Sequence, residues 1–268
     1  LVATKDQLDQ QGYDVQLTIE TFAPGELHRL RGLGEPLWYN GLLVTNTAPD
    51  DDAFIAHQEI GVPLVVFQRY TTASAVNVDN RLAAEQVARH LLALGHRRLA
   101  VIAPSTASQV HQLRIAGFQE LAARAGCHVE QLTAEGTTWT ESAYRTASVL
   151  LTRPVAERPS GLFATNDLLA LGVIRAARER GVRVPEDLAV VGFDDAEFAQ
   201  FMIPALTSVH LPIEEMAARA TAILLDLIQR KIQPPVQEMF SARLVIRESC
   251  GAKLATHLTD GVSGAPSV

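Results

Sequence analysis

Short apolar runs alternate with longer amphipathic stretches along most of this 268-residue chain. The apolar runs have the length of buried strands, and several of the stretches between them repeat apolar residues at helical spacing. Because parallel strands need crossovers of about a dozen residues or more, the alternation predicts an α/β fold with parallel sheets. The predicted strands are Tyr13–Thr18, Gly41–Thr45, Pro63–Phe67, Arg98–Ala103, His128–Thr133, Gly161–Ala164 and Leu188–Phe193.

Glycine and proline indicate where the helices begin and end. A glycine follows three of the amphipathic stretches, and a fourth stretch begins after Pro212 with an apolar stripe. The predicted helices are Arg81–Leu94, Gln109–Ala125, Leu168–Arg180 and 213–230. The chain opens on Ala3–Gln11, which has the pattern of the second half of a helix, so we expect that a preceding strand is missing. From Gly251 on, periodicity is lost, which predicts a mobile tail.

Composition and charge narrow the class of protein. Hydrophobic residues make up 47% of the chain and charged ones 20%, which indicates a folded globular protein. Lysine and arginine number 23 against 30 acidic residues, and the net charge of −7 argues against a basic nucleic-acid-binding surface. The longest apolar runs fall short of the roughly 20 residues that cross a bilayer, and no signal peptide is visible. With only Cys127 and Cys250, no disulfide framework is expected, and we predict a cytoplasmic protein.

Polar side chains follow several predicted strands directly. In open α/β sheets, ligands bind outside the carboxyl ends of the strands, so this is where a site is expected. Asp and Asn at such positions are also typical helix caps and turn residues. Because five strand ends share the feature, we favour a polar ligand site. Its candidates are Asn46, Gln68, Arg69, Asn166, Asp167, Asp194 and Asp195, with Trp139 in a predicted turn after the strand 128–133.

Arg114 and Trp139 allow two interpretations each, and Asp79 has one. Arg114 shares a helical stripe with Phe118 and Leu121, so we expect it on the packed side, where an unpaired guanidinium is costly. It forms either an ion pair with an Asp or a bidentate clamp on ligand oxygens. Trp139 is either a core aromatic or a ring that stacks on a sugar or a base. Asp79 is placed to cap the helix that follows it.

Several catalytic and cofactor motifs are absent. The sequence has no GxGxxG, no phosphate-binding GxxxxGK[ST], no GxSxG and no CxxC. Its eight histidines include no HxxxH or HxH pair that would bind zinc. We therefore expect no metal, no cofactor and no enzymatic activity.

Five segments, in order, resemble one known family. They are VNVDNRLAAEQVARHLLALGHRRLAVIAP, LRIAGFQELAARAG, GLFATNDLLALGVIRAARERGVRVPEDLAVVGFDD, PALTSVHLP and LVIRES. The order and spacing of GHRR, R-x-x-GF, ND-x-x-A-x-G, VP-x-D and VVGFDD are specific together, although each is weak alone. From Tyr13 to Ser249 the chain is similar to the effector-binding core of the LacI/GalR family of bacterial transcriptional repressors.

The resemblance implies a type I periplasmic-binding-protein fold, in which two Rossmann-like lobes hold an effector in the cleft between them. Three crossovers would fall near Val78–Arg81, His210–Pro212 and Gln237–Phe240. The first lobe would comprise residues 1–79 and 211–237, without its first strand. The second lobe would comprise residues 80–210 and 238–250, and residues 251–268 would form the mobile tail.

The resemblance also implies roles for individual residues. Arg114 matches the arginine of R-x-x-GF, Asn166 the asparagine of ND, and Asp194 the first aspartate of GFDD, and in the family these positions face the effector. Further effector contacts are expected at Trp139, which would stack on the ligand, and at Asp79, Gln68 and Arg69. A carboxylate, an amide and a guanidinium around a flat ring suit a ligand dense in hydroxyls.

Two departures from the family pattern limit these expectations. Family members begin with a helix-turn-helix of about sixty residues, which places recognition elements in DNA grooves and which this chain lacks. Leu211 stands in TSVHLP, where the family often has a glutamine. We therefore expect a homodimeric regulatory core that binds a sugar-like effector and reaches operator DNA only through the missing domain. The alternative is a periplasmic sugar-binding protein of a transport system, which shares the fold.

Overall fold

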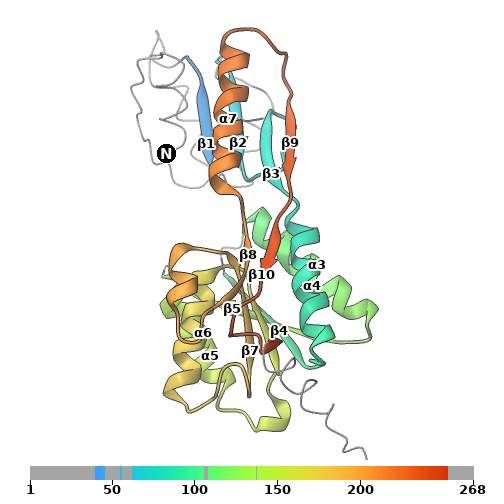
Figure 1. The fold of residues 1–268 in the computed structure, drawn as a ribbon, viewed down its shortest axis with the longest axis vertical. Helices are drawn as coiled ribbons and strands as arrows, with labels where there is room; N and C mark the ends of the chain where they lie inside the picture. The colour runs from blue at the N-terminus through green and yellow to red at the C-terminus, as the bar shows by residue number, and fades with distance from the viewer. Residues whose placement is uncertain (1–39, 46–54, 56–61, 106–107, 137, 253–268) are drawn as a thin grey trace, which may run out of the picture. The chain divides into compact units, whose positions relative to one another are not determined.

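The computed structural model describes residues 40–45, 55, 62–105, 108–136 and 138–252. It divides into two compact units (Figure 1). Unit 1 comprises residues 1–79, 108–110 and 212–241, and unit 2 comprises residues 80–107, 111–211 and 242–268. Several sequence-based predictions lie outside the described residues: the segment Ala3–Gln11, the strand Tyr13–Thr18, Asn46 and the tail beyond Ala252.

The described part of unit 1 is a parallel sheet with one helix packed along it. The strand order is β1-β2-β3-β9, and every neighbouring pair is parallel. The helix α7 (Ile213–Ile228) contacts β1, β2 and β3 and buries Met216, Ala220 and Ile223 at helical spacing. The strands are β1 (Leu42–Thr45), β2 (Leu64–Phe67), β3 (Ala75–Val78) and β9 (Gln237–Phe240).

Unit 2 contains a six-stranded sheet with the order β10-β8-β7-β6-β4-β5. All neighbouring strands run parallel except β10, which pairs antiparallel with β8 at the edge. Such a sheet, parallel throughout its interior, is typical of a fold with helices on both faces. The strands are β4 (Leu99–Pro104), β5 (Val129–Ala134), β6 (Gly161–Ala164), β7 (Ala189–Asp194), β8 (Thr207–His210) and β10 (Arg243–Val245).

Helices cover the two faces of this sheet. In Figure 1, α5 and α6 lie side by side on one face, and α3 and α4 lie on the other. Phe118 of α4 packs on Phe163 of β6, with ring centroids 5.1 Å apart. A Cβ at Gly172 would lie 2.2 Å from the Thr140 carbonyl oxygen, so glycine is what allows α5 and α6 to pack this closely. The helices are α3 (Asn80–Ala93), α4 (Gln109–Arg124), α5 (Trp139–Leu150) and α6 (Asp167–Glu179), with 3₁₀ turns η3 (Val155–Glu157) and η4 (Glu197–Phe201).

One sequence-based prediction is wrong. Trp139 does not lie in a turn: it is the first residue of α5, and the extended Thr138 (φ −104°, ψ 106°) precedes the helix. The segment contains several Thr and Ser residues, which favour turns in isolation. However, Ala143, Ala147 and Leu150 are buried at helical spacing, so packing on the sheet stabilises the helix.

Candidate functional site

The predicted polar residues of unit 2 gather at the carboxyl ends of β6 and β7. Asn166 and Asp167 follow β6, while Asp194 ends the neighbouring strand β7. The second turn of α4 brings Arg114 to the same group, and the start of α5 brings Trp139. This edge of a parallel sheet is where open α/β proteins bind ligands.

Arg114 is buried at the centre of this group, with 2% of its surface exposed. Its Nε donates a hydrogen bond to Asn80 Oδ1 (2.9 Å) and its Nη1 donates to the Thr165 carbonyl oxygen (2.7 Å). Nη1 also lies 3.2 Å from Asp194 Oδ1, and the guanidinium carbon sits 3.7 Å above the centre of the Phe193 ring. The expectation that Arg114 faces the packed side is confirmed. An ion pair with an Asp is present, and direct clamping of a ligand stays a prediction.

Asp194 presents its carboxylate at the surface of unit 2. Its side chain is 41% exposed although its partner Arg114 is buried. Asp194 and Asp195 both have positive φ, 105° and 54°, which turns the chain sharply where β7 ends. Burial nevertheless raises the pKa of Asp194, and the paired Arg114 guanidinium offsets only part of that rise. The exposed part of the side chain is open to a hydrogen-bond donor from outside unit 2.

Asn166 caps α6 and retains an unused donor. Its Oδ1 accepts a hydrogen bond from the Leu169 N–H (2.8 Å), so the interpretation as a helix cap is confirmed for the oxygen. Its Nδ2 is fully buried and has no hydrogen-bond partner among the described residues. A buried donor without a partner is costly, which makes this nitrogen a candidate contact for a ligand acceptor.

Trp139 and His111 form the aromatic side of the group. Trp139 remains 39% exposed, so it is not a core residue, and it meets the His111 ring edge-on at 5.8 Å. His111 is buried, and its Nδ1 lies 2.9 Å from Thr165 Oγ1. Burial, aided by the nearby Arg114 charge, lowers the pKa of His111 to about 3, so the imidazole is neutral at physiological pH. Sequence analysis missed His111, although its position three residues before Arg114 places both on one face of α4.

The remaining predicted contacts belong to unit 1. Gln68 and Arg69 follow β2 as predicted, and Arg69 is buried. The Gln68 N–H donates to the Val76 carbonyl oxygen (2.9 Å), while the Arg69 carbonyl oxygen accepts from Asn77 Nδ2 (3.0 Å). Asp79 directly precedes α3. A contact of Gln68, Arg69 or Asp79 with an effector stays a prediction.

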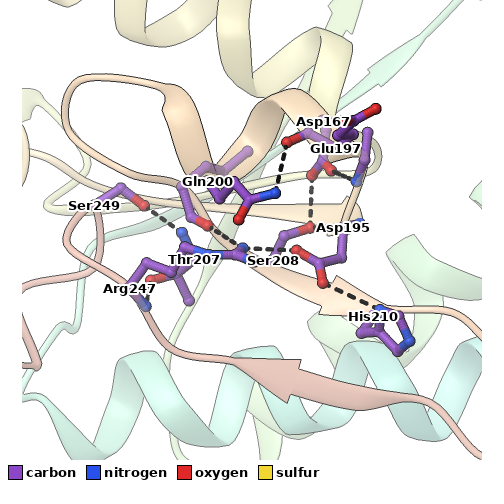
Figure 2. Close-up of polar contacts among 11 residues, drawn as sticks. Asp167, Asp195, Glu197, Gln200, Thr207, Ser208, His210, Arg247 and Ser249 are labelled. Atoms are coloured by element: carbon purple, nitrogen blue, oxygen red, sulfur yellow. Dashed lines mark hydrogen bonds and ion pairs between the residues drawn. The ribbon is translucent and has the colours of Figure 1, made fainter.

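Behind Asp194, a polar network links the end of β7 to β8 and to the segment after β10 (Figure 2). Asp167 accepts hydrogen bonds from Ser208 Oγ (2.6 Å) and from the Ala196 N–H (2.7 Å). Asp195 pairs with Arg247 (2.6 Å) and with His210 (3.1 Å). Burial raises the pKa of Asp167 to about 7, and the carboxylates of Asp194 and Asp195 add to the rise.

The described residues contain neither a metal-binding cluster nor a membrane-spanning helix. No group of three or more His, Cys, Asp or Glu side chains is placed to hold a metal ion. Within the same residues, no helix has both the length and the apolar character needed to cross a bilayer.

Comparison with known proteins identifies the family. Residues 88–250 match the periplasmic binding protein-like domain. An uncharacterised HTH-type transcriptional regulator of Streptomyces limosus is 34% identical over 226 residues, which are 82% of this chain and 63% of that protein. The HTH-type transcriptional regulator CelR of Thermobifida fusca is 32% identical over 90% of this chain and 72% of its own length. The chain thus spans less than two thirds of the first relative.

Solved structures agree with the sequence relatives. A complex of the transcriptional regulator CelR with cellobiose has a TM-score of 0.81 at 30% identity, covering 92% of this chain and 77% of that one. A LacI family regulator from Enterococcus faecium with bound ribose has a TM-score of 0.78 at 26% identity, covering 92% and 91%. The lac repressor dimer bound to operator has a TM-score of 0.80 at 26% identity, covering 92% and 87%. The predicted fold class is therefore confirmed, and the chain belongs to the LacI/GalR family of bacterial transcriptional regulators.

Proposed function

We propose that this chain is the ligand-sensing core of a LacI/GalR-type regulator and that it binds a small sugar-like effector at the ends of β6 and β7. One observation carries the proposal. A half-exposed carboxylate, Asp194, is paired with a buried guanidinium, Arg114, beside the unpartnered amide nitrogen of Asn166. These groups offer both hydrogen-bond acceptors and a donor within one small area of the sheet edge.

This chemistry suits a ligand rich in hydroxyl groups. The Asp194 carboxylate accepts hydrogen bonds from vicinal hydroxyls, and Asn166 Nδ2 donates to a ring or hydroxyl oxygen. The exposed Trp139 ring offers a flat apolar surface for the C–H face of a sugar. The cellobiose and ribose complexes of the two related regulators support the same ligand class.

The effector would act as a switch on DNA binding. A ligand can shift a conformational equilibrium only if it binds the two states with different affinity. We infer that the two compact units correspond to the two lobes of the family and that such states differ in lobe arrangement. Operator binding would require a helix-turn-helix domain, as the names of the HTH-type relatives indicate. Because those relatives are transcriptional regulators, we favour a cytoplasmic regulator over a periplasmic transport protein, and a binding function over catalysis.

A homodimer is the assembly that we propose. The lac repressor structure similar to this chain is a dimer. In unit 2, Phe201 and Ile203 are 72% and 87% exposed, although they lie within two residues of each other at the end of η4. Large apolar side chains grouped on a surface are typical of protein–protein contacts, and a second copy of this chain is the partner that we assign to them.

Thermal melting against a ligand panel tests the effector site. The panel contains monosaccharides, disaccharides, sugar phosphates, polyols, nucleosides and purine bases. A ligand at 100 times its Kd stabilises the folded state by about 2.7 kcal/mol, which gives a readable rise in Tm. We expect a sugar to stabilise the wild type and to lose that effect in Asp194→Ala. Asp187→Ala is the control, because Asp187 is an exposed carboxylate of the same unit that pairs with Arg183. Stabilisation by nucleobases alone, or an undiminished sugar response in Asp194→Ala, contradicts the proposal.

A further inference from the structure

We propose that Asp167 is a positioning residue of the effector site: it holds the turn 194–196 against β8 and so fixes the direction in which Asp194 presents its carboxylate. The inference rests on the proposed function of Asp194. Asp167 is buried, with 2% of its surface exposed, and both of its carboxyl oxygens already accept hydrogen bonds from the protein, so it is not assigned a direct contact with the effector.

The two backbone amides that follow Asp194 are both tied to the Asp167 carboxyl (Figure 2). The Ala196 N–H donates to Asp167 Oδ2 at 2.7 Å. The Asp195 N–H donates to Ser208 Oγ at 3.1 Å, and the Ser208 hydroxyl donates in turn to Asp167 Oδ1 at 2.6 Å. One side chain from the start of α6 therefore fixes two consecutive peptides at the end of β7.

The turn needs such support because its backbone is unusual. Asp194 and Asp195 are consecutive non-glycine residues with positive φ, a conformation that side chains with a Cβ adopt at a cost in free energy. Arg247 Nη1 and His210 Nδ1 hold the Asp195 side chain from the other side, at 2.6 and 3.1 Å. Contacts from both sides thus hold the turn 194–196 in its conformation. The contacts to the backbone of the turn come from the Asp167 carboxyl, directly and through Ser208.

The local sequence makes room for Asp167. A Cβ on Gly192 of β7 would lie 2.2 Å from Asp167 Oδ1, so only glycine lets the carboxyl approach the strand. The charged groups around Asp167 are the Asp194 and Asp195 carboxylates and the Arg114 guanidinium. A third anion close to the Asp194 and Asp195 carboxylates is unfavourable, and burial already raises the pKa of Asp167 to about 7. The hydrogen bonds from Asp167 to the turn offset part of this cost of burial and repulsion.

Two substitutions separate the hydrogen bonds from the charge. Asp167→Asn can retain both contacts, because an amide oxygen accepts from the Ala196 N–H and an amide nitrogen donates to Ser208 Oγ. Asp167→Ala removes both contacts. Asp187→Ala is the matched control, since Asp187 also accepts a backbone N–H, that of Arg183 at 2.9 Å, in unit 2 but in an exposed turn.

Hydrogen exchange without any ligand is the first measurement. We expect the amides of residues 195 and 196 to exchange at least about tenfold faster in Asp167→Ala than in wild type and in Asp167→Asn. The amides of β4 serve as the internal reference and should not change. If Asp167→Ala fails to fold, Ser208→Ala replaces it, because it breaks the link from the Asp195 N–H through Ser208 to Asp167 and leaves the Ala196 contact in place. The amide of residue 195 should then exchange faster, and that of residue 196 should not. Unchanged exchange of the turn in a folded variant overturns the proposal.

Affinity is the second measurement, with the sugar found in the melting panel as the probe. We expect Asp167→Ala to weaken binding at least about tenfold and Asp167→Asn to stay within about threefold of wild type. The Asp187→Ala control should bind as wild type does. A wild type that binds no sugar contradicts the proposed function, whereas the exchange experiment still decides the role of Asp167. A folded Asp167→Ala with wild-type affinity contradicts the positioning role alone.

Discussion

The pH dependence of stability offers a quantitative test of the burial of Asp167. The pKa of its carboxyl is raised from 3.8 to about 7 in the folded protein, chiefly by burial. Folding therefore strengthens proton binding. Below pH 3.8 the carboxyl is protonated in both the folded and the unfolded state, so it does not lower the free energy of unfolding. Above pH 7 it is ionised in both states, and the full destabilisation is present. The free energy of unfolding that Asp167 contributes therefore falls as the pH rises from 3.8 to 7.

The magnitude follows from the size of the shift. One pKa unit corresponds to about 1.4 kcal/mol, so a shift of about 3 units destabilises the folded state by about 4 kcal/mol at pH 8. At pH 5.5 about half of that cost remains, which leaves a change of about 2 kcal/mol across an accessible range. Asp167→Asn removes the titration and can keep both hydrogen bonds.

Urea unfolding of the wild type and of Asp167→Asn at pH 5.5, 6.5, 7.0 and 8.0 measures this change. We expect the stability of Asp167→Asn relative to wild type to increase by about 2 kcal/mol from the lowest pH to the highest. The difference between the two proteins is the relevant quantity, because the lowered pKa values of His90, His96 and His111 make the common background rise with pH. A difference that stays constant over the range would refute the assignment of Asp167 as a buried carboxyl that titrates near neutral pH.

Three further predictions concern packing and assembly. Gly192→Ala places a methyl group 2.2 Å from Asp167 Oδ1, so we expect about 1–3 kcal/mol of destabilisation in urea unfolding. Phe118→Ala removes a fully buried ring from the face between α4 and β6, and we expect a loss of about 3–5 kcal/mol by the same method. Phe201→Asp combined with Ile203→Asp places charges on an exposed apolar surface, and sedimentation velocity should show a monomer in place of the dimer.

Each of the three has a control. The cost of Gly192→Ala should shrink when Asp167→Ala is present, because the closer clash partner is gone and only the contact with Leu206 Cδ2 at 2.9 Å remains. Equal costs in both backgrounds contradict the prediction. Phe118→Leu should cost clearly less than Phe118→Ala, and similar losses would argue against tight packing on β6. Val155→Asp alters another exposed apolar residue, at 72% exposure, and should leave the dimer intact. A dimer that persists in the double variant assigns the contact to another surface.

Strands that are formed by a continuous apolar run could be predicted from the sequence. The strands Gly41–Thr45, Pro63–Phe67 and Gly161–Ala164 match the structure to within a residue, because each is an apolar run between turn residues. The missed strands β3, β8, β9 and β10 are short and carry polar residues such as Asn77, Thr207 and Glu238. These strands lie at or next to a sheet edge and are stabilised by pairing with their neighbours. The local sequence pattern does not indicate such pairing.

The candidate site was predictable where a residue type alone suggested chemistry. Arg114 in an apolar stripe and Asn166 after a strand both indicated polar partners, and the structure shows such partners for both. Ser208 and Arg247 gave no such signal, because their role arises from the pairing of distant segments. Ser208 lies 41 residues from Asp167, and Arg247 lies 52 residues from Asp195. Spatial contacts of this kind come from tertiary structure and not from periodicity.

The close packing of α5 on α6 has a consequence for how this site can change in evolution. Trp139 is the first residue of α5 and Asn166 caps α6, and Gly172 brings the two helices almost into backbone contact. The backbone packing at Gly172 thus fixes the register of the two helices and, with it, the spacing between Trp139 and Asn166. In the proposed site, we therefore expect a change of ligand size to be accommodated by substitutions at positions 139 and 166, and not by a shift of one helix along the other.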